Sequence, residues 1–312
     1  MELLKIKKAV VTGGTGFLGV HLIEELTRNG TEVMAICRPD SGNRERLKDK
    51  AGVELIECDM DSIEKLPLLI AHRDCDAFFH LAWEGASGKL RTDYSIQQKN
   101  AVNCCNAAVA AKTLGCRKII FTGTVYEKLC ESIIGSDNFK TPAFYLLSKK
   151  YAYDMLSQLT KQIGLDFVWC TFFHPIGKYI KQEQMMAYAV ACLLKGEQPA
   201  FGKAQEPYDI VAVEDIVYGL FLAGVTNLAK SKYYIGSGAP KRLFEYLERV
   251  QELVNPNVPL GIGVRPDDGL RFSFDWLDCS EFMTETGYNP RISFEKAVRN
   301  TKAWVMSKEE EC

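Results

Sequence analysis

One pair of side chains in this sequence has the types and the spacing needed to move a proton. Of the 13 tyrosines, only Tyr145 is followed four residues later by a lysine, Lys149. Residues 143–163 have a helical pattern, so the two side chains share one helix face. A phenol can give or take the proton of a carbinol oxygen while a hydride moves at its carbon, and a nearby ammonium lowers the pKa of a phenol from about 10. We therefore expect Tyr145 and Lys149 to catalyse proton transfer during hydride transfer.

Two hydroxyl side chains stand close to the end of one expected strand. The apolar run of residues 118–122 ends in Thr122, and Gly123 separates it from Thr124. Either hydroxyl could hydrogen-bond the reacting oxygen of a substrate. Counted from the last apolar residue of the run, Thr124 is the better candidate and Thr122 the second.

A glycine-rich turn provides a place for a dinucleotide. Residues 12–19, Thr-Gly-Gly-Thr-Gly-Phe-Leu-Gly, lie between the first expected strand and the first expected helix. At that place backbone N–H groups at the positive end of a helix can bind a pyrophosphate. A side chain at Gly13 or Gly16 would obstruct the turn or the phosphate, and one at Gly19 would hold the helix away from the strand. The turn predicts a nicotinamide dinucleotide.

The end of the second expected strand bears on which dinucleotide binds. An acidic residue there accepts hydrogen bonds from the ribose 2′-OH of NAD, but this chain has Cys37 followed by Arg38. An arginine can neutralise the 2′-phosphate of NADP with charge-assisted hydrogen bonds. The sequence therefore favours NADP(H), with NAD(H) as the less favoured coenzyme.

The elements that must position these residues alternate regularly in the first half of the chain. Apolar runs predict strands, and the stretches between them are long enough for crossover helices, which indicates a Rossmann-type, doubly wound parallel α/β sheet. The expected strands are residues 8–12, 32–37, 53–57, 77–81, 118–122 and 166–171. After residue 171 this rhythm gives way to Pro- and Gly-punctuated pieces. We expect residues 1–170 to form an NADP(H)-binding domain and residues 171–312 mainly a smaller substrate-binding lobe, with chain exchange between the two.

Composition argues against several other classes of protein. The formal net charge is -2, with 25% charged and 47% hydrophobic residues, so no nucleic-acid partner is indicated. No apolar run is long enough to span a membrane, and the few residues before the first strand leave no room for a signal peptide. The 11 cysteines include no C-x-x-C pair, which argues against a zinc or iron–sulfur site and for reduced thiols. We expect a soluble, cytoplasmic protein without a metal.

Taken together, these features resemble the extended short-chain dehydrogenase/reductase family, in particular its nucleotide-sugar epimerase, dehydratase and reductase branch. The likeness covers nearly the whole chain. Besides the glycine turn, the strand-end threonines and Tyr145 with Lys149, it includes Asp59, His80-Leu81-Ala82, Asn100, residues 208–215 and Arg265-Pro-Asp-Asp268.

The resemblance implies roles for individual residues. Asp59 and Met60 would lie by the adenine, and Phe172 with Phe173 would flank the nicotinamide. The full set of residues implied in coenzyme binding is Gly13, Thr15, Gly16, Phe17, Leu18, Gly19, Arg38, Asp59, Met60, Leu81, Ala82, Thr122, Lys149 and Phe172. The set implied in substrate binding is Trp83, Thr124, Tyr145, His174 and Arg265, of which Arg265 would hold a pyrophosphate.

Departures from the family pattern bear on the substrate and the reaction. Thr171 and Tyr208 stand where relatives usually carry arginines, and the second of those arginines commonly contacts the nucleotide diphosphate. The Asp-Glu pair typical of the 4,6-dehydratases is missing after Thr122 and after Thr124. Elimination of water needs an acid to protonate the leaving hydroxyl, so dehydratase chemistry is disfavoured. Glu127 could instead match a glutamate that follows the threonine in some sugar reductases.

The sequence thus favours NADPH-dependent reduction of a 4-keto nucleotide sugar, in particular a 6-deoxy one, with Tyr145 as the proton donor. A nucleotide-sugar 4-epimerase with tightly bound NAD would use the same residues. A carbonyl reductase of a non-sugar substrate would suit the two missing arginines. From a different class, a non-catalytic sensor of the NADP(H) redox state would have no need for Tyr145, Lys149 and a strand-end hydroxyl together.

The helices expected around residues 100–114 and 143–163 resemble those through which relatives pair as homodimers. Small residues would allow close approach of helices either between two subunits or inside one, and they are Ala107, Ala108, Ala110 and Ala111. We expect a homodimer.

Overall fold

The computed structural model describes residues 3–71, 73–134 and 143–310 and is built around one parallel sheet. Seven strands lie in the order β10-β6-β5-β4-β1-β2-β3, and every neighbouring pair is parallel. The strands are β1 (Lys8–Thr12), β2 (Glu32–Cys37), β3 (Val53–Glu57), β4 (Ala77–His80), β5 (Lys118–Thr122), β6 (Asp166–Thr171) and β10 (Lys232–Tyr234). The six strands expected from the sequence are present, with β4 one residue shorter than expected, and the Rossmann-type fold class is confirmed.

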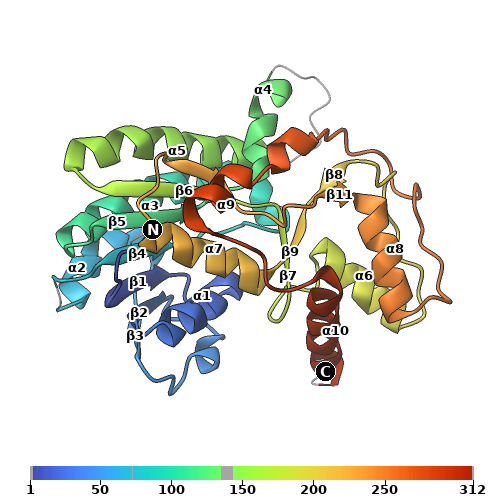
Figure 1. Ribbon diagram of the computed structural model, residues 1–312, viewed down its shortest axis with the longest axis horizontal. Coiled ribbons are helices and arrows are strands. Elements are labelled where there is room, and N and C mark those ends of the chain that lie inside the picture. The colour runs from blue at the N-terminus through green and yellow to red at the C-terminus, as the bar shows by residue number, and fades with distance from the viewer. Residues whose placement is uncertain (1–2, 72, 135–142, 311–312) are drawn as a thin grey trace.

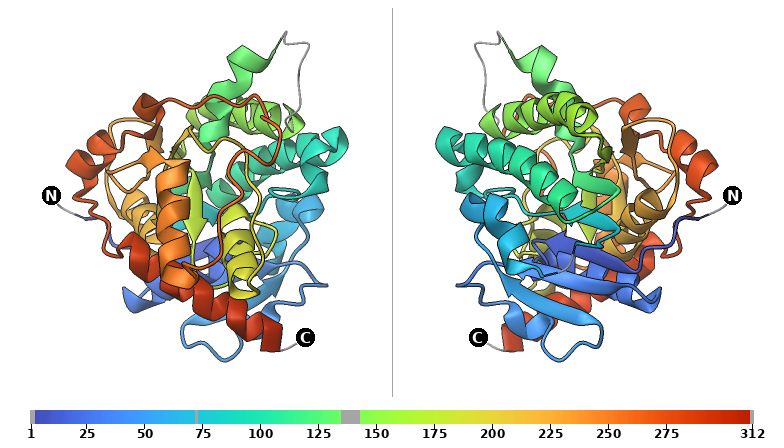
Figure 2. Two further views of the ribbon diagram at one scale, coloured as in Figure 1. Left: turned by 90° about the vertical axis from the view of Figure 1, so that its right-hand side faces the viewer. Right: turned by 90° about the vertical axis from the view of Figure 1, so that its left-hand side faces the viewer.

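Helices cover both faces of this sheet (Figures 1 and 2). On one face α1 (Phe17–Arg28) packs beside α7 (Val213–Val225), and on the other α3 (Tyr94–Thr113) packs beside α5 (Ala143–Ile163). Successive strand residues point to opposite faces, so Val11 belongs to the core under α1 and α7, and Val10 to the core under α3 and α5. The four alanines from Ala107 to Ala111 are buried inside the subunit, and Ala107, Ala108 and Ala111 belong to the second core.

Short elements connect the strands and carry much of the site. They are η1 (Arg44–Arg46), η2 (Met60–Lys65), α2 (Leu66–Leu69), η3 (Lys89–Thr92), η4 (Val125–Leu129) and α4 (Cys130–Ile133). α3 begins directly after η3 because the carboxylate of Asp93 accepts hydrogen bonds from the backbone N–H groups of Ser95 and Ile96, at 3.0 and 3.2 Å.

After β6 the chain builds a smaller lobe with its own core, on the right in Figure 1. Three helices pack around that core: α6 (Met185–Leu194), α8 (Leu243–Val254) and α10 (Phe294–Glu310). Two small sheets accompany them, β7 (His174–Ile176) with β9 (Ile210–Ala212), and β8 (Pro207–Tyr208) with β11 (Lys241–Arg242). Along the chain, η5 (Phe274–Leu277) and α9 (Ser280–Thr286) lie between α8 and α10.

One strand of the main sheet, β10, comes from well beyond the expected domain boundary at residue 170. After β9, α7 packs on α1, and β10 then pairs with β6, placing Lys232 beside Trp169 and Tyr234 beside Thr171. The sequence analysis did not identify this strand, because three residues are too few for an apolar pattern. The domain boundary at residue 170 stays a prediction, although α7 and β10 lie after it and pack on the main sheet.

The ten cysteines within the described ranges are free. No helix in these ranges is both long and apolar enough to cross a bilayer. The same ranges hold no group of three His, Cys, Asp or Glu side chains that could bind a metal ion.

Candidate active site

A cleft of about 550 Å³ opens at the carboxyl ends of the central strands. The order of strands reverses between β1 and β4, and ligands of doubly wound sheets bind at such a reversal. The cleft brings together predicted coenzyme residues from the ends of four strands and the predicted substrate residue Trp83: Gly13, Thr15, Gly16, Arg38, Asp59, Met60, Leu81, Ala82 and Trp83.

The glycine turn after β1 fits the phosphates of a dinucleotide. Gly13 has φ +68°, and a Cβ added to it would lie 3.1 Å from the backbone nitrogen of Ala82. A Cβ at Gly19 would lie 2.1 Å from the carbonyl oxygen of Gly13, so the close approach of α1 to the turn requires glycine there. The helix begins after Gly16, which has no side chain to cap it, so first-turn N–H groups of α1 are left for a ligand.

The turn is held by the neighbouring strand. The hydroxyl of Thr12 accepts hydrogen bonds from the backbone nitrogens of Leu81 and Ala82, at 3.2 and 3.3 Å. It also lies 3.0 Å from Nδ1 of His80, whose pKa is lowered to about 3 by burial. These contacts fasten the ends of β1 and β4 to each other at the centre of the cleft.

Cationic and hydroxyl side chains gather at the end of β2. Arg38 and Ser41 both line the cleft, and the Ser41 hydroxyl lies 2.9 Å from that of Thr15. A guanidinium nitrogen of Arg46 donates to the Thr15 carbonyl oxygen at 3.1 Å. The last residue of β2 is the buried Cys37, so this strand ends without a carboxylate for a ribose 2′-OH.

Six predicted coenzyme residues do not line the cleft. The side chains of Phe17 and Leu18 pack against the core under α1 and α7, and Phe172 is buried in that same core. Gly19 contacts the turn, and Thr122 and Lys149 are buried against each other behind the cleft. Phe17 and Leu18 are only partly buried, and their contact with a coenzyme stays a prediction.

The candidate catalytic side chains meet beside this cleft, at the end of β5. Tyr145 is only 8% exposed, and the side chain of Thr124 is a close polar neighbour of its phenol. Lys149, one turn later on α5, donates to the carbonyl oxygen of Thr122 at 2.7 Å. The indole of Trp83 lies between them: its ring centre is 3.7 Å from the Lys149 ammonium and 6.1 Å from the Tyr145 ring centre. The structure thus places Thr124, and not Thr122, at the phenol.

The ionisation of this pair differs from the expectation. Burial raises the pKa of Tyr145 to about 12, against a smaller lowering by the Arg91 guanidinium. Burial also lowers the pKa of Lys149 to about 8. The expected net lowering of the phenol pKa is therefore not seen: burial raises this pKa, and the cation that opposes the rise is Arg91 rather than Lys149.

Thr124 is held by a buried carboxylate rather than by solvent. The Glu127 carboxylate accepts the backbone N–H of Thr124 and the indole N–H of Trp169, both at 2.9 Å. Its other oxygen accepts from the Lys232 ammonium of β10 at 2.6 Å. Glu127 faces the sheet edge and not the phenol, so its expected likeness to a reductase glutamate finds no support as a contact to substrate. It positions Thr124.

An aromatic cluster of Tyr126, Phe173, Tyr208 and Phe272 adjoins the catalytic side chains. Phe173 stacks on Tyr208 with ring centres 4.5 Å apart, and Tyr126 is hydrogen-bonded to Tyr208. Phe173 therefore belongs to this cluster, and its expected place beside the nicotinamide stays a prediction. His174 lies next to the cluster, with its ring centre 6.4 Å from that of Tyr208.

Two buried nitrogen atoms around the aromatic cluster lack a partner. Nε2 of His174 forms no hydrogen bond, and burial lowers the pKa of this imidazole to about 4, so the ring is neutral. Nε of Arg91 is likewise unpaired. The sequence does not single out Arg91, because it lies in the short helix η3 and no spacing of residues marks it.

Arg265, expected to hold a pyrophosphate, lies apart from the aromatic cluster. Its side chain is exposed, and its guanidinium stacks over the ring of Tyr188 on α6 at 5.0 Å. The contacts of Arg265 are thus within the smaller lobe.

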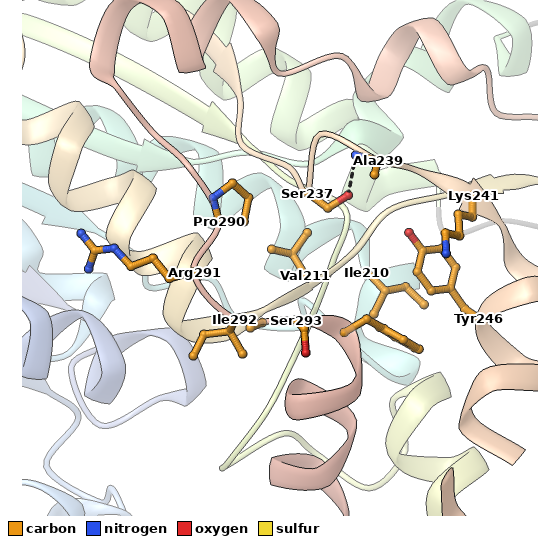
Figure 3. Close-up of a pocket in the computed structure, with 12 residues that line it drawn as sticks. Ile210, Val211, Ser237, Ala239, Lys241, Tyr246, Pro290, Arg291, Ile292 and Ser293 are labelled. Atoms are coloured by element: carbon orange, nitrogen blue, oxygen red, sulfur yellow. Dashed lines mark hydrogen bonds between the residues drawn. The ribbon is translucent and has the colours of Figure 1, made fainter. Parts of the chain in front are cut away.

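A second cavity, of about 400 Å³, lies in the smaller lobe between β9, the loop before β11 and the start of α10 (Figure 3). Ile210, Tyr246 and Arg291 are among its lining residues, and the Ser237 hydroxyl in its wall accepts the backbone N–H of Ala239 at 3.0 Å. None of the predicted site residues lines it. The predicted coenzyme residues and Trp83 line the first cleft instead.

Known proteins resemble this chain over nearly its whole length. The NAD dependent epimerase/dehydratase family matches residues 9–236. The dTDP-glucose 4,6-dehydratase of Haemophilus influenzae is 24% identical, over 95% of this chain and 97% of the relative. Among solved structures, the Bordetella bronchiseptica enzyme WbmF in complex with NADH has a TM-score of 0.81 at 20% identity, covering 99% of this chain and 94% of that one.

A third similar protein is a UDP-N-acetylglucosamine 4-epimerase from Methanobrevibacter ruminantium M1, in complex with UDP-N-acetylmuramic acid. Its TM-score is 0.80 at 23% identity, with 98% of this chain and 100% of that chain covered. These structural likenesses establish the fold, and the family match extends over well more than half of the sequence. The chain belongs to the NAD dependent epimerase/dehydratase family and is an NAD(P)-dependent enzyme of the extended short-chain dehydrogenase/reductase type.

Proposed function

We propose that the protein uses NADPH to reduce the 4-keto group of a nucleotide sugar, with Tyr145 as the proton donor. The observation that carries this proposal is the meeting of Tyr145, Thr124 and Lys149 at the end of β5, next to the glycine-lined cleft. When bound, the coenzyme supplies the hydride. The residues of this chain then have to bind the sugar, orient its carbonyl oxygen and deliver one proton to it.

Each catalytic side chain has one task in this scheme. The hydroxyls of Thr124 and Tyr145 are close neighbours, so in a complex each can donate its one O–H to the same carbonyl oxygen. Lys149 is fixed by the Thr122 carbonyl and keeps further N–H donors for the ribose hydroxyls of a nicotinamide nucleotide. Trp83, which covers that ammonium, limits access of water to the reacting atoms.

The raised pKa of Tyr145 favours reduction over oxidation. A phenol with a pKa of about 12 stays protonated at neutral pH and is ready to give its proton to a developing alkoxide. An epimerase starts by oxidising its substrate and therefore needs the phenolate first. The runner-up, a nucleotide-sugar 4-epimerase with tightly bound NAD, is supported by the family to which the chain belongs.

The end of β2 supports NADPH as the coenzyme. Arg38 and Ser41 line this part of the cleft and suit a 2′-phosphate, whereas Cys37 offers no acceptor for a ribose 2′-OH. The similar enzyme WbmF was solved with NADH, so coenzyme identity is the point on which the two functions separate. NAD released when the purified protein is denatured would favour the epimerase.

One feature favours the third function, a carbonyl reductase of a non-sugar substrate. Tyr208 replaces an arginine that relatives use for the diphosphate, and its ring is stacked on Phe173. The aromatic cluster thus provides apolar surface where a nucleotide sugar would need a cation.

The Tyr145→Phe variant tests the proton donor. Without the phenolic hydroxyl, kcat for NADPH oxidation with 4-keto nucleotide sugars should fall by about 10²–10⁴-fold, the usual contribution of a general acid. The Kd for NADPH should stay within about twofold, because Tyr145 is not among the residues that line the coenzyme cleft.

Tyr218→Phe on α7 is the matched control, since it removes a phenolic hydroxyl from a helix on the opposite face of the sheet. Its kcat should equal that of the wild type. An unchanged kcat in Tyr145→Phe would show that the proton comes from elsewhere.

We also propose that two chains pair through α3 and α5. Both helices expose apolar side chains to solvent in the single chain: Tyr94, Val102 and Val109 on α3, and Phe144, Tyr151 and Met155 at or along α5. A second copy of the same face would cover them as a four-helix contact.

A further inference from the structure

The positive charge of Arg91 is not paired with a carboxylate of any residue that the structure describes. Arg91 belongs to η3, and its guanidinium lies 4.5 Å from the ring centre of Tyr145 and 5.2 Å from that of Tyr126. Its Nε is buried and has no hydrogen-bond partner, and Arg91 forms no ion pair with any residue that the structure describes. A cation is thus held over the very phenol that serves the reacting oxygen.

Two aromatic faces do not replace the water that this guanidinium has lost. An arginine keeps its positive charge throughout the physiological pH range, so it cannot relieve the loss by deprotonating. A cation–π contact is weaker than a pair of charge-assisted hydrogen bonds to an anion. The guanidinium of the half-buried Arg91 therefore obtains a hydrogen-bond partner for its unpaired Nε–H group only when an anion binds beside it.

Three carboxylates from the segments around Arg91 already accept hydrogen bonds from other groups. Glu127 accepts from Thr124, Trp169 and Lys232, as described above. Asp93 caps α3. Asp268 accepts the backbone N–H of Leu270 at 3.0 Å. The anion that pairs with Arg91 must therefore come from a ligand.

The position of Arg91 narrows the source of that anion. The coenzyme phosphates belong at the glycine turn, and in a nucleotide sugar the diphosphate is bonded to carbon 1, away from the reacting carbon 4. A substituent near the ring of Tyr145 is attached next to the reacting carbon. A carboxylate is planar and accepts two parallel hydrogen bonds from a guanidinium, which suits this place.

We propose that Arg91 binds a carboxylate on the sugar carbon beside the reacting carbinol, so that the substrate is the nucleotide conjugate of a sugar acid. This inference rests on the proposed function and names its substrate class. It departs from the 6-deoxy sugar suggested by the sequence, because a methyl group provides no anion. The tyrosine at position 208, where relatives usually carry an arginine, is consistent with this proposal. Without that arginine, recognition of negative charge depends more on Arg91, near the reacting carbon of the sugar.

The experiment is isothermal calorimetry on the NADPH-saturated protein with matched neutral and acidic sugars. The probes are UDP-glucose, UDP-glucuronate and the corresponding two dTDP conjugates, all of which already carry a 4-hydroxyl and so bind without being reduced. Wild-type protein should bind the glucuronate at least tenfold more tightly than the glucose conjugate of the same nucleotide. Arg91→Met should abolish that preference by weakening glucuronate binding alone.

Two further variants make the comparison specific. Arg91→Lys keeps a charge without the bidentate fork and should lose part of the preference, and it carries the test if Arg91→Met melts at a much lower temperature. Lys89→Met removes an exposed cation from the same short helix and should leave both affinities within twofold.

Each other outcome has a distinct meaning. Equal binding of glucose and glucuronate by wild type, or equal loss of both in Arg91→Met, would overturn this inference alone. Weaker NADPH binding in Arg91→Met would assign the anion to the coenzyme and also overturn it. Binding of NADPH with no binding of any of the four conjugates would overturn the proposed function, and this inference with it.

Discussion

At the scale of single residues, burial governs the chemistry of this site. The same desolvation that raises the pKa of Tyr145 to about 12 lowers that of Lys149 to about 8. Proximity of the two side chains along α5 was readable from their four-residue spacing. The direction of the phenol's pKa shift was not, because it depends on how deeply Leu146, Trp83 and the strand end cover the pair.

Lys149 gives a measurable pH dependence of stability. Its pKa is 10.5 in the ordinary state and about 8 in the fold, so between these values the unfolded chain binds more protons. The free energy of unfolding contributed by this residue therefore rises with pH across that window, by at most about 1.4 kcal/mol per pH unit for one proton. Lys149→Met should lack this rise.

The measurement is urea unfolding of both proteins between pH 7.5 and 10.5, a range chosen to span that window. The difference in unfolding free energy, wild type minus Lys149→Met, should increase with pH, since all other titrating groups are shared. A flat or falling difference would mean that the lysine is not desolvated in the folded protein.

At the scale of elements, η4 depends on a strand that arrives from far along the chain. Glu127 of η4 bonds the backbone of Thr124, and Lys232 of β10 pairs with Glu127. The carboxylate is buried while the ammonium is about a third exposed, so the pair is only partly screened by solvent. The position of Thr124 is thus supported both by the end of β5 and by the edge strand β10.

Glu127→Gln should weaken this connection. Loss of the charged partner of Lys232 should lower the free energy of unfolding by about 1–3 kcal/mol, the usual range for a hydrogen bond to a charged group. Because Thr124 loses part of its support, kcat should fall while the Kd for NADPH is preserved. Chemical denaturation and steady-state kinetics measure the two effects.

A double-mutant cycle with Lys232→Met separates the pair from its surroundings. The combined variant should cost less than the sum of the two single changes, and Glu131→Gln on α4, an exposed position, should cost nothing measurable. Strict additivity would mean that the two side chains do not interact in solution.

Prediction from sequence succeeded for long apolar runs and failed for short or aperiodic segments. Five of the six expected strands have the bounds read from the sequence, because each is a continuous apolar run that ends at glycine or polar residues. β10 has only three residues. Arg91 lies in η3, and the chain around η3 is held by side-chain contacts: Gln97 donates to the carbonyl oxygens of Gly85 and Leu90. Such side-chain-to-loop bonds leave no periodic pattern in the sequence.

At the scale of the whole molecule, the exposed apolar face of α3 and α5 bears on assembly. The alanines that were weighed as a dimer contact are buried inside the subunit, so the solvent-facing residues are different ones, such as Val109 and Met155. Glutamates at these two positions should convert a dimer to a monomer, because two copies of the pair would oppose like charges in an apolar contact.

Sedimentation velocity of Val109→Glu/Met155→Glu tests this assembly. Lys161→Glu on α5 changes the charge of an exposed position without removing an apolar side chain, and it should sediment like the wild type. A wild-type protein that sediments as a monomer at all concentrations would contradict the proposed pairing.

The late return of β10 to the main sheet limits how this enzyme can be recombined with its relatives. A chimera that joins residues 1–170 of this chain to the remainder of another would keep Glu127 but take a foreign residue in place of Lys232. The Glu127 carboxylate that holds Thr124 would then face a residue from a different protein in place of Lys232. Exchange of substrate specificity between such enzymes should therefore transplant only the segments on either side of α7 and β10, and leave those two elements with the coenzyme half.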